Sequence, residues 1–194
     1  YAKAAVEVAI MDAVGRRLSV PVYQLLGGRF RDKVEIAHSI GLMDIDMAVA
    51  EAAKVVEEGV TTLKIKIGLD PDRDLSIGRE VRKAVGDKTR IRVDANQGYR
   101  NWRQAVDAIQ RMTEFGIAYA EQPVDGVPAM AEVSARCSVP IMADESVWTE
   151  RDVIAVATAG AAQYLSVYYT KPGGLWKTRR LLTVAGAHGF ACDI

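Results

Sequence analysis

"TTLKIKIG", residues 61–68, places two lysines inside a run of strand-forming residues. Apolar residues that alternate with polar ones are typical of a β-strand, and successive side chains of a strand point to opposite faces. Lys64 and Lys66 therefore share one face, and the apolar side chains share the other. Because two ammonium groups are unfavourable in a dry core, we expect the lysine face to border a polar site.

Strand-like and helix-like patterns alternate along the rest of the chain, with a repeat of roughly 25 residues. We expect helices between the strands, with Asp46, Asn101 and Thr149 as N-caps. This alternation predicts parallel strands joined by helical crossovers. The expected strands are at residues 33–41, 61–68, 89–98, 117–123, 139–146, 163–174 and 189–194.

Repeated strand–helix units of this number favour a (β/α) barrel. An open, doubly wound sheet of the flavodoxin type is the alternative, and it usually has about five strands. No GxGxxG or GxxxxGK[ST] motif follows any expected strand, so the sequence does not indicate a nucleotide site.

The overall charge and the cysteine count exclude several classes of protein. The 194 residues carry 25 Lys plus Arg and 25 Asp plus Glu, whereas nucleic acid and membrane-surface partners call for a basic excess. Cys137 and Cys192 are too few for a disulfide framework or a zinc site, and we expect both to be reduced. No apolar run reaches the ~18 residues of a membrane helix. We therefore expect a cytoplasmic protein without nucleic acid or membrane partners.

Acidic residues follow three successive expected strands: Asp94 in "DAN", Glu121 in "EQP", and Asp144 with Glu145 in "ADES". The carboxyl ends of barrel strands meet at one rim, where barrel active sites are built. One acidic residue at such a place is usually a helix cap or an ion-pair partner. Three of them, with Lys-x-Lys on the preceding strand, indicate a functional site.

Carboxylates that converge on one rim repel each other unless a cation lies among them. Ligands that are all oxygen favour Mg²⁺ or Mn²⁺. Lysines that face such a metal would lie beside a small carboxylate substrate, and a neighbouring cation lowers a lysine pKa into a range useful for proton transfer. The metal would acidify the carbon next to the carboxylate and stabilise the resulting enediolate.

Four short segments, "KIKIG", "RVDANQGY", "EQPV" and "ADES", resemble the enolase superfamily in their order and spacing, specifically its muconate-lactonizing-enzyme branch. The opening "AKAAVEVAIMDAVGRRLSVPVYQLLGG" is also similar to the helical segment that leads into the family's barrel. The resemblance implies a (β/α)₇β TIM-like barrel with Asp94, Glu121 and Asp144 as the Mg²⁺ or Mn²⁺ ligands. It also implies Lys66 as the acid/base and Lys64 as its partner near the substrate carboxylate.

The resemblance also suggests where the domains divide. Residues 1–30 would form the helical segment that leads into the barrel, and residues 31–194 would hold strands one to seven. Because the chain opens in mid-helix without a start methionine and stops on a strand, we expect a fragment. Such a fragment would lack the family's α+β capping domain, which is mostly N-terminal, and the last barrel elements. Members are usually oligomeric, which implies a homo-oligomer.

One position departs from the branch. Many members carry a second catalytic lysine on strand six in a Lys-x-x-Lys-x-Gly-Gly context, whereas this chain has "YYTKPGG". Lys171 matches the second lysine, and Tyr168 replaces the first unless the register shifts. Because a tyrosine carries no positive charge, two-base racemisation or epimerisation is disfavoured. We expect Tyr168, Lys171 and Asn96 to contact the substrate together with Lys64.

A reaction that needs one proton-transfer group therefore fits best, foremost the cycloisomerisation of cis,cis-muconate in aromatic degradation. Dehydration of an acid sugar or hydroxy acid, and o-succinylbenzoate synthesis, stay open, as does a metal-binding barrel with a purely structural role. Two smaller expectations concern side chains near the rim. His38 is either a substrate contact or a satisfied core histidine, and Glu145 is expected to pair with Lys171.

Overall fold

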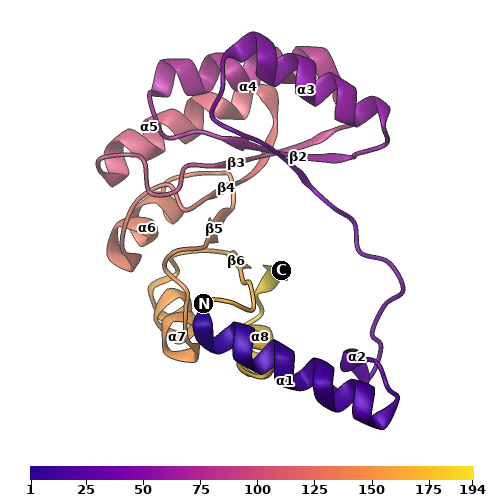
Figure 1. Ribbon diagram of the computed structural model, residues 1–194. Coiled ribbons are helices and arrows are strands. Elements are labelled where there is room, and N and C mark those ends of the chain that lie inside the picture. The colour runs from indigo at the N-terminus through magenta and orange to yellow at the C-terminus, as the bar shows by residue number, and fades with distance from the viewer.

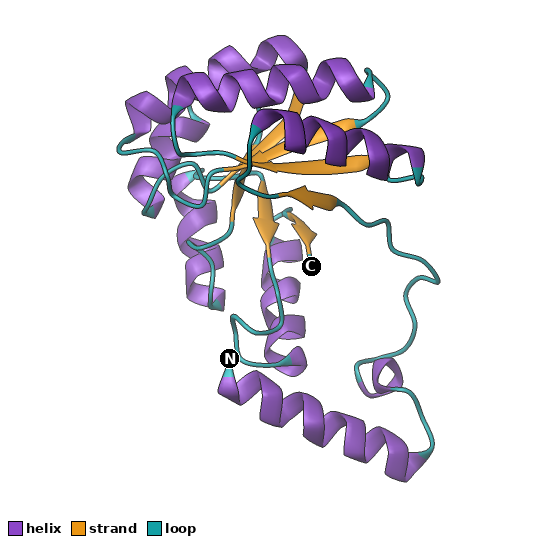
Figure 2. Cartoon of the chain, turned by 45° about the horizontal axis from the view of Figure 1, so that its top comes forward, coloured by secondary structure: helices purple, strands orange, loops and turns teal.

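Seven parallel strands of the computed structural model, which describes residues 1–194, make up one sheet. They are β1 (His38–Ile40), β2 (Thr62–Lys66), β3 (Arg90–Asp94), β4 (Ile117–Glu121), β5 (Ile141–Ala143), β6 (Tyr164–Ser166) and β7 (Ala191–Asp193). Each strand pairs with the next one along the chain, and β1 and β7 are the two edges. The sheet curls with helices on its outer side (Figures 1 and 2). The fold is thus a seven-stranded part of a (β/α) barrel, which confirms the predicted fold class.

Helices connect the strands, and none of them is both long and apolar enough to cross a membrane. They are α1 (Ala2–Leu18), α2 (Val22–Leu25), α3 (Ile45–Glu57), α4 (Pro71–Val85), α5 (Trp102–Met112), α6 (Val127–Ser134), α7 (Glu150–Ala159), α8 (Leu175–Ala187) and the short 3-10 helix η1 (Thr113–Phe115). Asn101 and Thr149 cap α5 and α7 through their side chains, as predicted. Asp46 is not the N-cap of α3, because the helix begins earlier and its N-cap is Asp44.

The register of the sheet aligns the predicted site residues. Lys64 pairs with Arg92, and Lys66 pairs with Asp94 on the next strand. Asp94 in turn pairs with Glu121 on β4. Because paired residues of neighbouring strands share a face, the ammonium and carboxylate groups of three strands lie together on the inner side of the sheet, near the strand ends.

The hydrophobic core lies between the sheet and its helices. Outward side chains such as Leu63 and Ile65 are fully buried and belong to one continuous apolar cluster. The inner side is polar instead: Arg92 of β3 forms an ion pair with Asp193 of β7, and the hydroxyl of Tyr119 donates to the same carboxylate. This contact between the third and the last strand shows how strongly the sheet curls.

The opening helix α1 lies beside α8, and the segment 26–37 runs as an arm from α2 back to β1 (Figure 1). Glu7 of α1 accepts hydrogen bonds from the backbone N–H groups of Leu175 and Trp176 at the start of α8. Negative charge is favourable at a helix N-terminus. A side chain at Gly174 would collide with this carboxylate. These two hydrogen bonds attach α1 to the start of α8.

All seven strands are shorter than the sequence predicts, and β1 and β6 differ most. β6 ends at Ser166, because the chain then turns, with backbone hydrogen bonds from Lys171 to Tyr168 and from Gly174 to Tyr169. Proline and glycine at residues 172–174 do not continue a strand. Tyr168 and Lys171 therefore lie in a loop at the end of β6 and not within the strand.

Candidate active site

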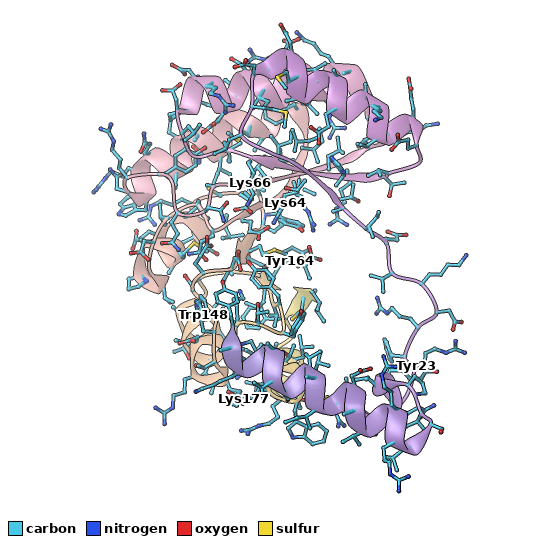
Figure 3. The ribbon with its side chains drawn as sticks, viewed as in Figure 1. Tyr23, Lys64, Lys66, Trp148, Tyr164 and Lys177 are labelled. Atoms are coloured by element: carbon cyan, nitrogen blue, oxygen red, sulfur yellow. The ribbon has the colours of Figure 1, made fainter.

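Lys64 and Lys66 lie on the side of β2 that faces the later strands (Figure 3). The Lys66 ammonium donates hydrogen bonds to Oδ2 of Asp94 at 2.6 Å and to Oδ1 of Asn96 at 2.5 Å. The Lys64 ammonium lies 3.1 Å from the same Asp94 oxygen and 3.2 Å from Oε2 of Glu121. The two ammonium groups on one face are thus balanced by carboxylates from the next two strands.

These carboxylates determine the pKa of Lys64. Burial alone would lower this pKa, but the negative charges of Glu121 and Asp94 outweigh burial and raise it. The lowering of a lysine pKa beside a bound metal ion stays a prediction, because the nearest charges of Lys64 in the structure are carboxylates.

The three predicted carboxylates are almost completely buried at the same rim: Asp94, Glu121 and Asp144 are each at most 3% exposed. Burial raises the pKa of Glu121 to about 7, and the negative charge of Asp94 adds to this shift while Lys64 opposes it. A carboxyl pKa that is raised first by burial and then by neighbouring negative charge is common at functional sites.

Tyr168 and Lys171 both contact Asp144. The Lys171 ammonium is buried and donates to the Asp144 carboxylate at 2.6 Å, to its backbone oxygen at 2.7 Å and to that of Ser166 at 2.6 Å. The Tyr168 hydroxyl donates to the two Asp144 carboxylate oxygens at 2.8 and 2.9 Å. Burial and the Asp144 carboxylate raise the pKa of Tyr168. This hydroxyl therefore stays neutral and oriented toward Asp144.

Asn96 lies at the centre of a second network. Its Oδ1 accepts from Lys66, its Nδ2 donates to Oε1 of Glu145 at 2.9 Å, and its backbone N–H donates to Asp94 at 3.0 Å. Oε2 of Glu145 is buried and has no hydrogen-bond partner. The predicted ion pair between Glu145 and Lys171 is wrong, because the three acceptors of Lys171 are oxygens of Asp144 and Ser166.

His38 does not face this rim. It pairs in register with Leu63, whose side chain belongs to the core between sheet and helices. Its Nε2 lies 2.6 Å from Oε1 of Glu51 on α3. Of the two roles considered from the sequence, the structure therefore supports the satisfied histidine.

Sequence reasoning missed Gln122, which is fully buried. Its Oε1 accepts from the backbone N–H groups of Asp144 and Ser146 at 2.9 and 3.2 Å, and its Nε2 donates to Val124 and Ser146. Gln122 thereby connects the loop after β4 to the loop after β5. The sequence did contain a signal for this role: Gln122 has an uncharged amide side chain and follows Glu121 directly, at a strand end where a buried polar group needs hydrogen-bond partners.

Three carboxylates and a buried unpaired oxygen of Glu145 fit a hard cation such as Mg²⁺ or Mn²⁺, since every acidic donor in this set is oxygen. No three of the acidic, histidine or cysteine side chains lie close enough together to surround one ion. Lysine ammonium groups pair with these carboxylates in the structure. Metal binding would therefore require the lysine and carboxylate side chains to move.

A curled parallel sheet with lysines and carboxylates at its strand ends defines the class of (β/α)-barrel proteins with a site at the carboxyl rim. The chain belongs to the enolase C-terminal domain-like family, whose sequence model matches residues 47–194. Residues 1–27 match the model described as the mandelate racemase / muconate lactonizing enzyme N-terminal domain. The resemblance noted in the sequence is thus confirmed.

Relatives of known activity include more than one kind of enzyme. The chain is 38% identical to muconate cycloisomerase 1 of Rhodococcus opacus, over 99% of this chain and 52% of that protein. A crystal structure of N-succinyl Arg/Lys racemase from Bacillus cereus matches with a TM-score of 0.96 and 32% identity, over 100% of this chain and 53% of that one. A dipeptide epimerase from Enterococcus faecalis, complexed with Mg and the dipeptide L-Leu-L-Tyr, matches with a TM-score of 0.94 and 31% identity, over 100% and 55%. The chain spans about half the length of these relatives.

Proposed function

We propose that this chain is the catalytic barrel part of a Mg²⁺-dependent enzyme that transfers a proton at the carbon next to a substrate carboxylate. Lys66 is its acid/base, and Asp94, Glu121 and Asp144 hold the metal. Within this chemistry we propose the cycloisomerisation of a muconate. The observation that carries the choice is Tyr168, whose neutral hydroxyl donates to Asp144.

The relatives support the broader chemistry and leave the reaction type open. They include a muconate cycloisomerase, a racemase and a dipeptide epimerase that binds Mg. Racemisation and epimerisation need a proton-transfer group on each side of the reacting carbon, because a proton leaves from one face and another arrives at the opposite face. Cycloisomerisation needs only one such group.

Tyr168 is a neutral residue at the position where many members of the branch have a second catalytic lysine. The pKa of the Tyr168 hydroxyl is raised above its ordinary value, and this hydroxyl donates its hydrogen bond to the Asp144 carboxylate. Lys171 is not a free substitute, since its ammonium is buried and donates to three oxygens. Lys66 is about a quarter exposed and has an ammonium that reaches the rim. These contacts favour one-sided proton transfer.

The residues divide the work as follows. The distal carboxylate oxygen of the muconate adds to the far carbon of the double bond that is conjugated to the other carboxylate, and the C=C π bond breaks. Its electrons move to the carbon next to that other carboxylate, and Lys66 gives its proton to this carbon. Lys64, whose pKa is raised, stays positively charged and orients the substrate carboxylate. When bound, Mg²⁺ would supply positive charge that stabilises the negative charge developing on the substrate carboxylate. Asn96 holds the Lys66 ammonium in place.

The test is to incubate the protein with MgCl₂ and cis,cis-muconate and to follow the loss of the diene absorbance and the appearance of a lactone. The Lys66→Ala variant should lose about 10²–10⁴-fold in rate, which is the contribution that general acid–base catalysis typically makes. Lys83→Ala is the matched control, since Lys83 is exposed and pairs only with Glu80. Lys66→Ala activity close to that of Lys83→Ala would contradict the assigned role.

Other products would redirect the proposal. A one-base dehydration is also compatible with Lys66 acting alone, so acid sugars, hydroxy acids and the precursor of o-succinylbenzoate belong in the same assay. Deuterium uptake from D₂O at the carbon next to the carboxylate separates any of these enzymes from a metal-binding barrel with a structural role. No uptake with any of these carboxylates would favour the structural role.

A further inference from the structure

A buried carboxylate outside the rim connects two loops of the site. Asp74, in the first turn of α4, is fully buried. Its Oδ2 accepts a hydrogen bond from the backbone N–H of Gly68 at 2.8 Å and from the hydroxyl of Tyr99 at 3.1 Å. Gly68 comes two residues after Lys66, and Tyr99 comes five residues after Asp94. One carboxylate oxygen therefore joins the loop after β2 to the loop after β3.

The two loops are in direct backbone contact. Gly68 has a φ of +94°, and a side chain there would place its Cβ 2.6 Å from the backbone oxygen of Ala95. A side chain at Gly98 would collide with the backbone of Gly68. Position 68 requires glycine for two reasons: its φ is positive, and the backbone of Ala95 leaves no space for a Cβ. Such packing leaves each loop little freedom to move without the other.

A carboxylate at position 74 is energetically unfavourable. Burial raises its pKa, and its Oδ1 has no hydrogen-bond partner. The nearest cation, the guanidinium of Arg73, lies 3.6 Å from that oxygen. Arg73 itself donates to the backbone oxygen of Met43 at 2.6 Å, in the loop after β1. A buried, incompletely paired carboxylate costs stability, so packing alone does not account for Asp74 at the point where three rim loops meet.

A short series of contacts leads from Asp74 to the site. Tyr99 holds the far end of the loop 95–99, and the backbone N–H of Asn96 in that loop donates to Oδ1 of Asp94 at 3.0 Å. The Asn96 side chain accepts from the Lys66 ammonium at 2.5 Å. We propose that Asp74 is a positioning residue, which sets the orientation of the Asp94 carboxylate and of the Lys66 ammonium through Tyr99 and the loop 95–99.

This inference rests on the proposed metal site, and two measurements keep the two apart. The first is the Kd of Mg²⁺ alone, measured by titration calorimetry with MgCl₂. We expect Asp74→Ala and Tyr99→Phe to weaken binding by about tenfold, the lower end of the range for residues that orient metal ligands. Asp74→Asn keeps an acceptor oxygen for both donors, so it should restore the Kd to within about threefold.

The matched control is Thr89→Val at the opposite end of β3. Thr89 is buried like Tyr99, and its hydroxyl also donates one hydrogen bond, to Val85. We expect this variant to lose stability without a change in the Kd. An unchanged Kd in folded Asp74→Ala and Tyr99→Phe, or an equal loss in Thr89→Val, would overturn the proposal. If Asp74→Ala does not fold, Tyr99→Phe decides.

The second measurement needs no metal. Amide hydrogen exchange of a peptide that covers the loop 95–99 should be at least about tenfold faster in Tyr99→Phe and Asp74→Ala, and close to wild type in Asp74→Asn and Thr89→Val. If the wild-type protein binds no Mg²⁺, the proposed function fails, and hydrogen exchange alone then decides the role of Asp74. Equal exchange in all variants would refute that role.

Discussion

Replacing Tyr168 with phenylalanine should weaken Mg²⁺ binding by about tenfold, although the hydroxyl is not itself among the proposed metal ligands. The hydroxyl donates to Oδ2 of Asp144 at 2.8 Å and to Oδ1 at 2.9 Å, whereas Lys171 contacts only Oδ1, at 2.6 Å. Without the hydroxyl, Oδ2 keeps no donor in the structure. The Asp144 carboxylate can then rotate about its Cβ–Cγ bond. Mg²⁺ binding is weaker as a result, because the carboxylate must be ordered when the metal binds.

The magnitude follows from these two contacts. A hydrogen bond to a charged group contributes about 1.5–3 kcal/mol, and removal of a residue that orients a metal ligand typically costs about 10–100-fold in affinity. Because Lys171 still holds one oxygen, we expect the lower end. A tenfold change corresponds to about 1.4 kcal/mol of binding free energy.

Titration calorimetry with MgCl₂ on the wild-type and variant proteins measures this change. Tyr169→Phe is a matched control: Tyr169 is the next residue, it is 42% exposed against 40% for Tyr168, and it is not a donor to Asp144. The control should bind as the wild type does. The reasoning is refuted if Tyr168→Phe binds Mg²⁺ as tightly as the wild type, or if Tyr169→Phe loses as much affinity.

Three further predictions concern pH and stability. Because Glu121 has a pKa of about 7 and must lose its proton to bind a cation, Mg²⁺ affinity at pH 6 should be about tenfold weaker than at pH 8; calorimetry that finds equal affinities would contradict this. Gly78→Ala should lower the free energy of unfolding in urea by about 1–2 kcal/mol, because the new Cβ collides with the buried ring of Phe115 and overpacking outweighs the gain in helix propensity; an unchanged or higher urea midpoint would refute it. Glu7→Ala should cost about 1–2 kcal/mol by the same assay, because two N–H groups of α8 lose their acceptor, and Glu7→Gln should recover part of this loss.

The sequence predicts those parts of the site that depend on local periodicity. Alternation along a strand places Lys64 and Lys66 on one face, and the parallel arrangement brings Asp94 and Glu121 to neighbouring positions in the register. The cap at Thr149 depends on residues within one turn of each other, and it is confirmed. These features need only the spacing of residue types.

The remaining features depend on contacts between loops that are distant in sequence. Gln122 fills a gap between two loops, and no periodicity marks its four hydrogen bonds. Asn96 and Gln122 adopt positive φ values of 42° and 36°, which are uncommon for residues other than glycine. Neighbouring loops hold these conformations. Tyr168 could be located from the sequence, but its hydroxyl partner Asp144 could not.

The support of the three carboxylates differs, and this difference shows which of them responds to charge. Asp94 accepts from Lys66 and from the backbone N–H of Asn96, and Asp144 accepts from Tyr168 and Lys171. Glu121 accepts side-chain hydrogen bonds from Lys64 alone.

A carboxylate with two donors of different origin keeps its orientation when one donor moves. Glu121 does not have this second support, and it is also the group whose pKa is raised to about 7. A cation that displaces the Lys64 ammonium would therefore change the charge environment of Glu121 most. For this reason we expect proton release on Mg²⁺ binding near neutral pH to come from Glu121, and to disappear above about pH 8 as that carboxyl becomes fully ionised.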